Sequence, residues 1–87
     1  MKVSDFIGKE ASYDEYGQII WGKDNNDKLQ MIADVRGWGA IQHLFMNGKG
    51  ELDEVKATKF QDDLGRWIVE AINEKLARER GNNGNQG

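Results

Sequence analysis

The sequence contains no cysteine and no proline, and its only histidine is His43. The missing cysteine excludes disulfides, thiolate zinc sites and a cysteine nucleophile. A zinc site needs three or four nitrogen, sulfur or oxygen ligands, and one histidine without cysteine does not meet that need. We therefore expect neither a metal site nor a cofactor.

Long apolar runs are also missing. No stretch approaches the roughly 20 apolar residues of a membrane-spanning helix, and residues 1–10 lack the apolar core of a signal peptide. Together with the absence of cysteine, this predicts a soluble cytoplasmic protein that has no membrane partner.

Basic charge is not in excess. Lys and Arg number 12 against 15 Asp and Glu, which gives a formal net charge of −3, and the two signs are interspersed along the chain. Proteins that neutralise phosphates usually carry a clustered basic excess. Nucleic-acid binding is therefore disfavoured and would need a local basic patch.

The length of 87 residues allows one small domain. We assign residues 1–80 to a single α+β domain. Residues 81–87, GNNGNQG, have neither charge nor an apolar side chain, so they cannot bury surface to offset the entropy of ordering. This composition predicts a disordered tail over residues 81–87.

Residues 53–80 carry the clearest periodic pattern. The apolar residues recur at steps of three and four, which predicts a long amphipathic C-terminal helix with Asp53 as its N-cap. They are Ala57, Phe60, Leu64, Trp67, Ile68, Ala71, Ile72 and Leu76. Gly65 lies inside this helix, where glycine costs roughly 1 kcal/mol against alanine. Two explanations remain: a backbone or large ring approaches closely there, or the helix is slightly weakened.

Upstream, residues 28–36 alternate in polarity. Leu29, Met31, Ala33 and Val35 share one face of a half-buried strand, and Ile32 is the exception to the alternation. With the β-like residues 17–22 and the polar turn between them, this predicts an antiparallel hairpin over about 17–36, and residues 9–13 are a candidate third strand.

The predicted architecture is thus a small antiparallel hairpin or sheet, a short helical corner and one long helix packed across the sheet. The expected core residues are Ile20, Leu29, Met31, Val35, Trp38, Phe60, Leu64, Trp67, Ile68 and Ile72.

Residues 34–45 combine an arginine, a tryptophan between two glycines, and the histidine. One interpretation is a chain reversal that uses the freedom of Gly37 and Gly39, with Trp38 as core. The other is a stacking platform in which Arg36 and His43 flank Trp38, as in sites for single-stranded nucleic acid or nucleotides. The acidic balance of the chain favours the first interpretation.

No catalytic constellation is visible. The sequence has no nucleophile elbow, no phosphate-binding glycine loop and no histidine-based triad that spacing reveals. We therefore expect a protein that is not an enzyme.

Two segments carry a family resemblance. IADVRGWG and FQDDLGRWIVEAINEKL resemble parts of small uncharacterised proteins of bacterial prophages and mobile elements, over roughly residues 28–78. The resemblance implies a compact accessory protein in a bacterial or phage-infected cytoplasm, and a role in binding and modulating another protein. It carries over no catalytic or binding residue.

Geometry also predicts self-association. A helix over 53–80 would measure roughly 42 Å, whereas a compact domain of this size would be about 30 Å across. The overhanging end carries Ile72 and Leu76, and a second copy in a homodimer would cover them. The alternatives are a frayed helix end or a different partner.

We therefore expect a non-enzymatic protein-interaction or modulator module. Its candidate interaction residues are Arg36, Trp38, His43, Ile72 and Leu76. The alternative is a single-stranded nucleic-acid or nucleotide binder that uses Trp38, Arg36 and His43.

Overall fold

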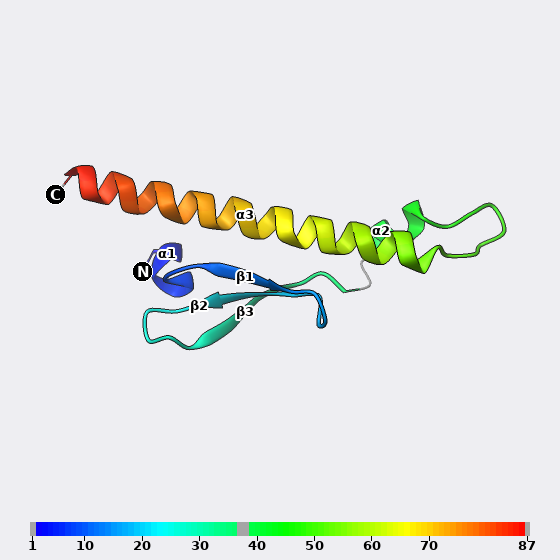
Figure 1. Cartoon of the computed structure of the whole chain (residues 1–87), viewed down its shortest axis with the longest axis horizontal. Coiled ribbons are helices and arrows are strands. Elements are labelled where there is room, and N and C mark those ends of the chain that lie inside the picture. The colour runs from blue at the N-terminus through cyan, green and yellow to red at the C-terminus, as the bar shows by residue number, and fades with distance from the viewer. Residues whose placement is uncertain (1, 37–38, 87) are drawn as a thin grey trace.

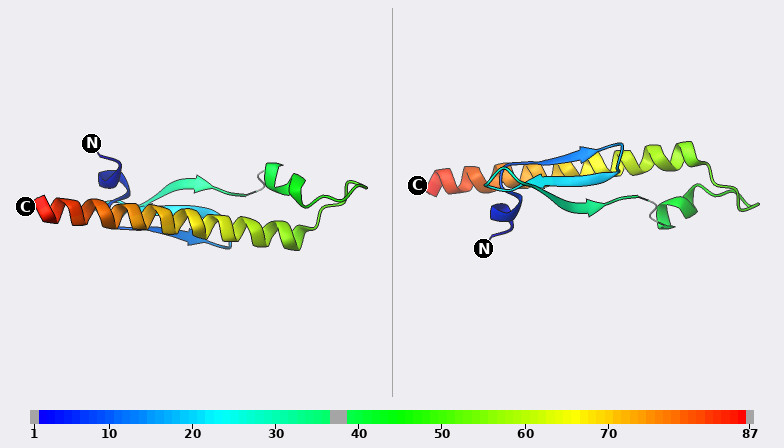
Figure 2. Two further views of the ribbon diagram at one scale, coloured as in Figure 1. Left: turned by 90° about the horizontal axis from the view of Figure 1, so that it is seen from above. Right: turned by 90° about the horizontal axis from the view of Figure 1, so that it is seen from below.

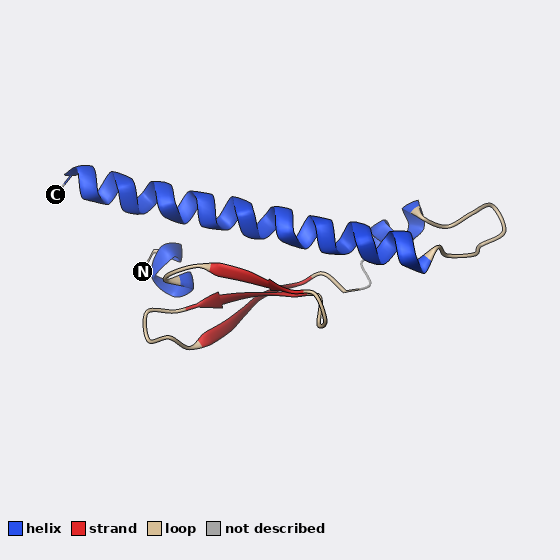
Figure 3. Ribbon diagram, in the orientation of Figure 1, coloured by secondary structure: helices blue, strands red, loops and turns tan. Residues whose placement is uncertain are grey.

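The fold is α+β, as predicted. The computed structural model describes residues 2–36 and 39–86 and combines a three-stranded antiparallel sheet, two short helices and a long C-terminal helix (Figures 1 and 3). In chain order the elements are α1 (Val3–Ile7), β1 (Ala11–Asp14), β2 (Ile19–Lys23), β3 (Leu29–Asp34), α2 (Gly39–Leu44) and α3 (Glu54–Gln86).

The sheet is a meander in the order β1-β2-β3. The predicted hairpin is its β2–β3 half, and the candidate third strand is β1. Asp24 builds the turn between β2 and β3, because its Oδ1 accepts hydrogen bonds from the backbone N–H of Asn26 (2.8 Å) and of Lys28 (3.0 Å). Asp27 in the same turn has a φ of 64°, a conformation that aspartate tolerates better than most residues.

A β-bulge interrupts the pairing of β2 with β3. Ile20 pairs with Ala33 and Trp21 pairs with Met31, so Ile32 is an extra residue in β3. An extra residue shifts the side-chain alternation by one position. Leu29 and Met31 therefore lie on the face opposite to Ala33, and the single common face predicted for this strand is wrong. Ile32, the exception to the alternation, marks the bulge.

The core lies between the sheet and α3. Ala11, Ile20 and Val35 are buried at its centre, and half-buried residues of α3, among them Ile68 and Ile72, pack against them. Figure 2 shows β1 running along α3 and β3 on the side away from it. The helix therefore covers the sheet unevenly.

The predicted core is partly confirmed. Ile20 and Val35 are buried, and Leu64, Ile68 and Ile72 are half-buried. Four predicted core residues are exposed instead, namely Leu29 (63%), Met31 (58%), Phe60 (41%) and Trp67 (66%). Trp38 lies outside the described residues.

The buried side of α3 explains the exposure of Phe60 and Trp67. Its most buried residues include Ala57, Gln61 and Gly65, at successive steps of four. A methyl group added to Gly65 would overlap the ring of Tyr13, which confirms the explanation that a large ring approaches the helix there. Two small residues, Ala57 and Gly65, thus lie on the side of α3 that is closest to the rest of the chain, and the two large aromatic residues lie to the side of it.

The N-terminal end of α3 agrees with the prediction, and its C-terminal end differs from it. Asp53 is the N-cap, as predicted, because its Oδ1 accepts a hydrogen bond from the Lys56 N–H (3.1 Å). At the other end the helical backbone continues through Gln86, beyond the predicted last residue, Arg80. The disorder predicted for residues 81–87 stays a prediction.

Candidate functional site

The predicted stacking site is only partly described. Arg36 follows β3 and is exposed, and His43 is an exposed residue of α2, while Trp38 lies outside the described residues. The Arg36 guanidinium donates to both carboxylate oxygens of Asp34, through Nη2 (2.6 Å) and Nε (3.0 Å). These bonds hold the pKa of Asp34 below its ordinary value. The charge of Arg36 is therefore already paired within the chain.

The predicted interaction residues on α3 are covered by the chain itself. Leu76 is only 5% exposed and Ile72 is half-buried, and together with Val3 and Ile7 of α1 they line a small cavity of about 130 Å³. The molecule is also elongated, at 60 × 24 × 18 Å, rather than the expected 30 Å across. The premise that a free helix end leaves Ile72 and Leu76 uncovered is therefore wrong, because α1 packs beneath that end.

A different apolar surface is open. Trp21 and Met31 are direct cross-strand partners, and Leu29 pairs with Lys23 on the same face of the sheet, opposite to α3. We call Trp21, Leu29 and Met31 the outer apolar face. The alternation of β3 predicts Leu29 and Met31 in the core instead, and the irregular position of Ile32 is the signal in the sequence that points to this face.

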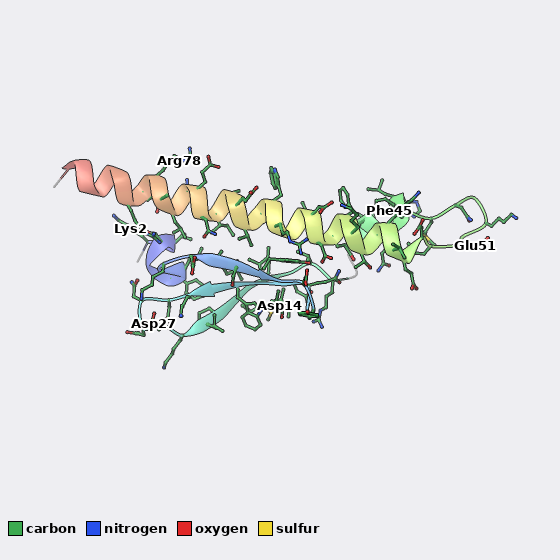
Figure 4. All side chains as sticks on the ribbon, in the orientation of Figure 1. Lys2, Asp14, Asp27, Phe45, Glu51 and Arg78 are labelled. Carbon is green, nitrogen blue, oxygen red and sulfur yellow. The ribbon has the colours of Figure 1, made fainter. Side chains whose placement is uncertain are left out.

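Polar groups lie at both ends of this face. The pairing places Lys23 at the end near the β2–β3 turn, and it places Asp14 and Asp34 beside Ile19 at the other end. Figure 4 shows Asp27 and Asp14 at these opposite ends of the sheet. An apolar centre with a polar rim is the usual anatomy of a protein interface.

A second feature joins the β1–β2 hairpin to α3. The Tyr13 hydroxyl donates a hydrogen bond to Asp62 Oδ1 (2.6 Å), and Arg66 lies over the Tyr13 ring, 5.5 Å from its centroid, while pairing with Glu15 (2.7 Å). Burial first, and then the hydrogen bond to Asp62, raise the pKa of Tyr13. A raised pKa keeps the hydroxyl protonated, which is the opposite of what a phenolate base or nucleophile needs. We therefore assign a structural role to these side chains, which hold the β1–β2 hairpin against α3.

A third feature is a cavity of about 230 Å³ between the β1–β2 turn, α2 and α3. Glutamine amides from each of these elements line it, from Gln18, Gln42 and Gln61. Gln61 is 4% exposed, its Oε1 accepts from Gln18 Nε2 (3.3 Å), and its own Nε2 has no hydrogen-bond partner among the described residues. A buried donor without a partner costs free energy, so this amide lowers the stability of the fold.

The loop between α2 and α3 borders a further, open cavity of about 520 Å³. Its lining mixes apolar Phe45 and Leu52 with acidic Glu51 and Asp53. Across residues 2–36 and 39–86, no three His, Cys, Asp or Glu residues lie close enough together to hold a metal ion. The carboxylates of this loop therefore form no metal-binding cluster.

The described helices also contain no segment with the length and apolar character required to cross a membrane. Comparison with known proteins adds no relative: no protein-family model, no curated protein and no solved structure matches this chain.

Proposed function

We propose that this chain is a small non-catalytic protein-interaction module that binds its partner on the outer apolar face. The observation that carries the proposal is the presence of Trp21, Leu29 and Met31 on the side of the sheet that α3 leaves open. An antiparallel sheet with one covered face normally presents polar side chains on the other. Apolar residues clustered on an open face with a polar rim are typical of an interaction surface.

The exposure of the side chains on the outer apolar face supports a role in binding a protein partner. Leu29 and Met31 keep more than half of their surface accessible, at 63% and 58%. The half-buried Trp21 pairs with Met31 across the sheet, and it provides a rigid aromatic side chain between β3 and β1. Aromatic residues and methionine are the side chains enriched at the centres of interfaces.

The alternative, a nucleic-acid or nucleotide binder that uses Arg36, Trp38 and His43, has less support. Phosphate binding relies on cationic groups, and the Arg36 guanidinium already pairs with the neighbouring Asp34. We therefore favour a protein partner, in keeping with the accessory, modulating role that the prophage resemblance implies.

Affinity capture with matched variants tests the proposal. Tagged wild type, Met31→Lys and Leu44→Lys are each incubated with lysate of the host cell, and the bound proteins are quantified by mass spectrometry. Leu44 is the control because it is an apolar residue of α2 with 71% exposure, away from the sheet. We expect the same protein to bind wild type and Leu44→Lys, and to be lost with Met31→Lys.

Two results would contradict the proposal. One is a partner that binds Met31→Lys as well as it binds wild type. The other is recovery of nucleic acid whose binding weakens steeply as salt is raised, which is the signature of phosphate contacts.

A further inference from the structure

The two edges of the sheet differ in their protection. At β1, the Asn73 side chain of α3 binds both backbone groups of Ala11, accepting from its N–H (2.7 Å) and donating to its C=O (2.9 Å). Arg80 donates to the Gly8 carbonyl (3.1 Å) just before the strand. Within the described residues β3 pairs with β2 alone, so its other edge has no strand beside it.

The hydrogen-bonding direction of β3 can be assigned. Asp24 N–H donates to the Lys28 carbonyl (2.9 Å), so Lys28 directs its backbone groups toward β2. Because this direction alternates along an antiparallel strand, the backbone N–H and C=O groups of Gln30 also point toward β2. Leu29 and Met31 therefore present their N–H and C=O groups to the open edge.

The usual protection of an edge strand is largely missing here. Natural sheets block their edges with charged residues, proline, bulges or a covering element. Residues 29–33 of this chain, LQMIA, contain neither charge nor proline. The bulge at Ile32 limits regular pairing to the residues before it, and the one charged residue of β3, Asp34, lies beyond the bulge.

We propose that a second copy of this chain pairs along the β3 edge, antiparallel, about a two-fold axis at Gln30. This inference rests on the proposed function, since it uses Leu29 and Met31 of the outer apolar face. In this register Leu29 of each copy lies opposite Met31 of the other. These are the two residues whose backbone groups face the open edge, so each pair exchanges two hydrogen bonds.

The register is consistent in its side chains as well. Cross-strand partners must lie on the same face of a sheet, and Leu29 and Met31 share the outer face. Gln30 meets its own copy on the axis, where two uncharged amides face each other without like-charge repulsion. A one-residue shift would place Leu29 opposite Gln30 and break this match. The apolar-polar-apolar segment LQM is thus self-complementary when reversed, which favours a second copy over an unrelated strand.

Cysteine cross-linking tests the register directly, because the chain has no cysteine of its own. A non-hydrogen-bonded antiparallel pair has its Cα atoms about 4.5 Å apart, within disulfide range. We expect Gln30→Cys to form a covalent dimer under mild oxidation. The matched control, Ser12→Cys, introduces an exposed cysteine in β1 and should stay monomeric. Far-UV circular dichroism checks that both variants fold.

Sedimentation of the purified protein gives the second measurement. An interface made by one pair of edge strands is small and therefore weak, so the protein concentration should span roughly 10 to 500 µM. We expect a monomer–dimer equilibrium for wild type and for Leu44→Lys, and a monomer throughout for Met31→Lys. A wild type that stays monomeric, a dimer that Met31→Lys leaves intact, or equal cross-linking of the two cysteine variants would overturn the proposal. Because only purified protein is used, that result would leave the partner-capture experiment to decide the proposed function.

Discussion

Gly65 of α3 lies directly against the ring of Tyr13 in β1, with no room for a methyl group between them. Two residues near Gly65 hold the Tyr13 side chain in place, because Asp62 accepts a hydrogen bond from its hydroxyl (2.6 Å) and Arg66 lies over its ring. This contact brings the helix close to β1, and it therefore determines which side of α3 faces the sheet.

Gly65→Ala should destabilise the protein. In an unobstructed helix interior, alanine is favoured over glycine by up to about 1 kcal/mol. Here the new methyl group overlaps the Tyr13 ring, and overpacking of this kind costs about 1 to 3 kcal/mol. We expect a net decrease in the free energy of unfolding, measured by urea denaturation.

Two controls separate the overlap from helix propensity. Gly81→Ala, where no described atom beyond the adjacent residues and the helix's own backbone lies within 4 Å of the added group, should be neutral or stabilising. In a Tyr13→Val background, Gly65→Ala should become stabilising because the ring is gone. An unchanged penalty in that background would show that the Tyr13 contact is not the cause.

The pKa of Tyr13 gives a prediction at alkaline pH. Burial, and the hydrogen bond to Asp62, raise it above the ordinary value of 10.0, so folding favours the neutral hydroxyl. The stabilisation is complete below pH 10.0 and is lost as the pH rises through the raised pKa. The chain has two tyrosines, so in Tyr16→Phe the alkaline absorbance change belongs to Tyr13. We expect Tyr13 to ionise above pH 10 and Asp62→Asn to lower the pH at which this ionisation occurs.

The buried side of α3 could be predicted only in part. Counting apolar residues finds the helix, and Ile68 and Ile72 are correctly placed toward the core. It does not find that Gln61 and Gly65 lie on the buried side, because neither is apolar. Closest approach between two elements depends on small side chains and on one ring fitting between them, and a hydrophobic pattern does not contain that information.

The outer apolar face was missed for a related reason. The alternation predicts Leu29, Met31, Ala33 and Val35 on one face with Ile32 as the exception, whereas one extra residue at Ile32 reverses the face of everything before it. The pairing of Trp21 with Met31, rather than with Ile32, decides the orientation of Leu29 and Met31. Pairing register depends on contacts between strands, whereas the irregular position of Ile32 is visible in the sequence alone.

Asp24 should make the protein sensitive to acid. Hydrogen bonds from the backbone N–H of Lys28, and then of Asn26, hold its pKa below the ordinary value of 3.8. The charged form is favoured by folding, so its contribution is complete above about pH 3.8 and is lost as the pH falls through the lowered pKa. Asp24→Asn keeps an acceptor oxygen in the turn but cannot titrate. We expect its stability to depend less on pH below 3.8 than that of wild type. Equal acid dependence would contradict the assignment.

Gln61→Met should stabilise the protein. The substitution keeps the side-chain volume and removes a buried Nε2 donor that has no partner in the part of the chain that the structure describes. An unsatisfied buried donor costs about 1 to 3 kcal/mol, and the hydrogen bond lost from Gln18, at 3.3 Å, offsets only part of the gain. We expect an increase of about 1 kcal/mol in the free energy of unfolding. Gln42→Met, on the same cavity but half-buried, should change little. A loss of stability in Gln61→Met would mean that water in the cavity satisfies the amide.

Leu76→Ala should loosen the packing of α1 on the end of α3. Leu76 is 5% exposed and borders the cavity of about 130 Å³ beneath α1, so the truncation enlarges a void. Removing a buried leucine in this way costs about 2 to 4 kcal/mol. Leu44→Ala, at a residue with 71% exposure, should cost less than about 0.5 kcal/mol. Sedimentation of Leu76→Ala should give the same association as wild type, because Leu76 faces its own chain. Unchanged stability with weaker association would instead place the dimer contact at Ile72 and Leu76, where the sequence first suggested it.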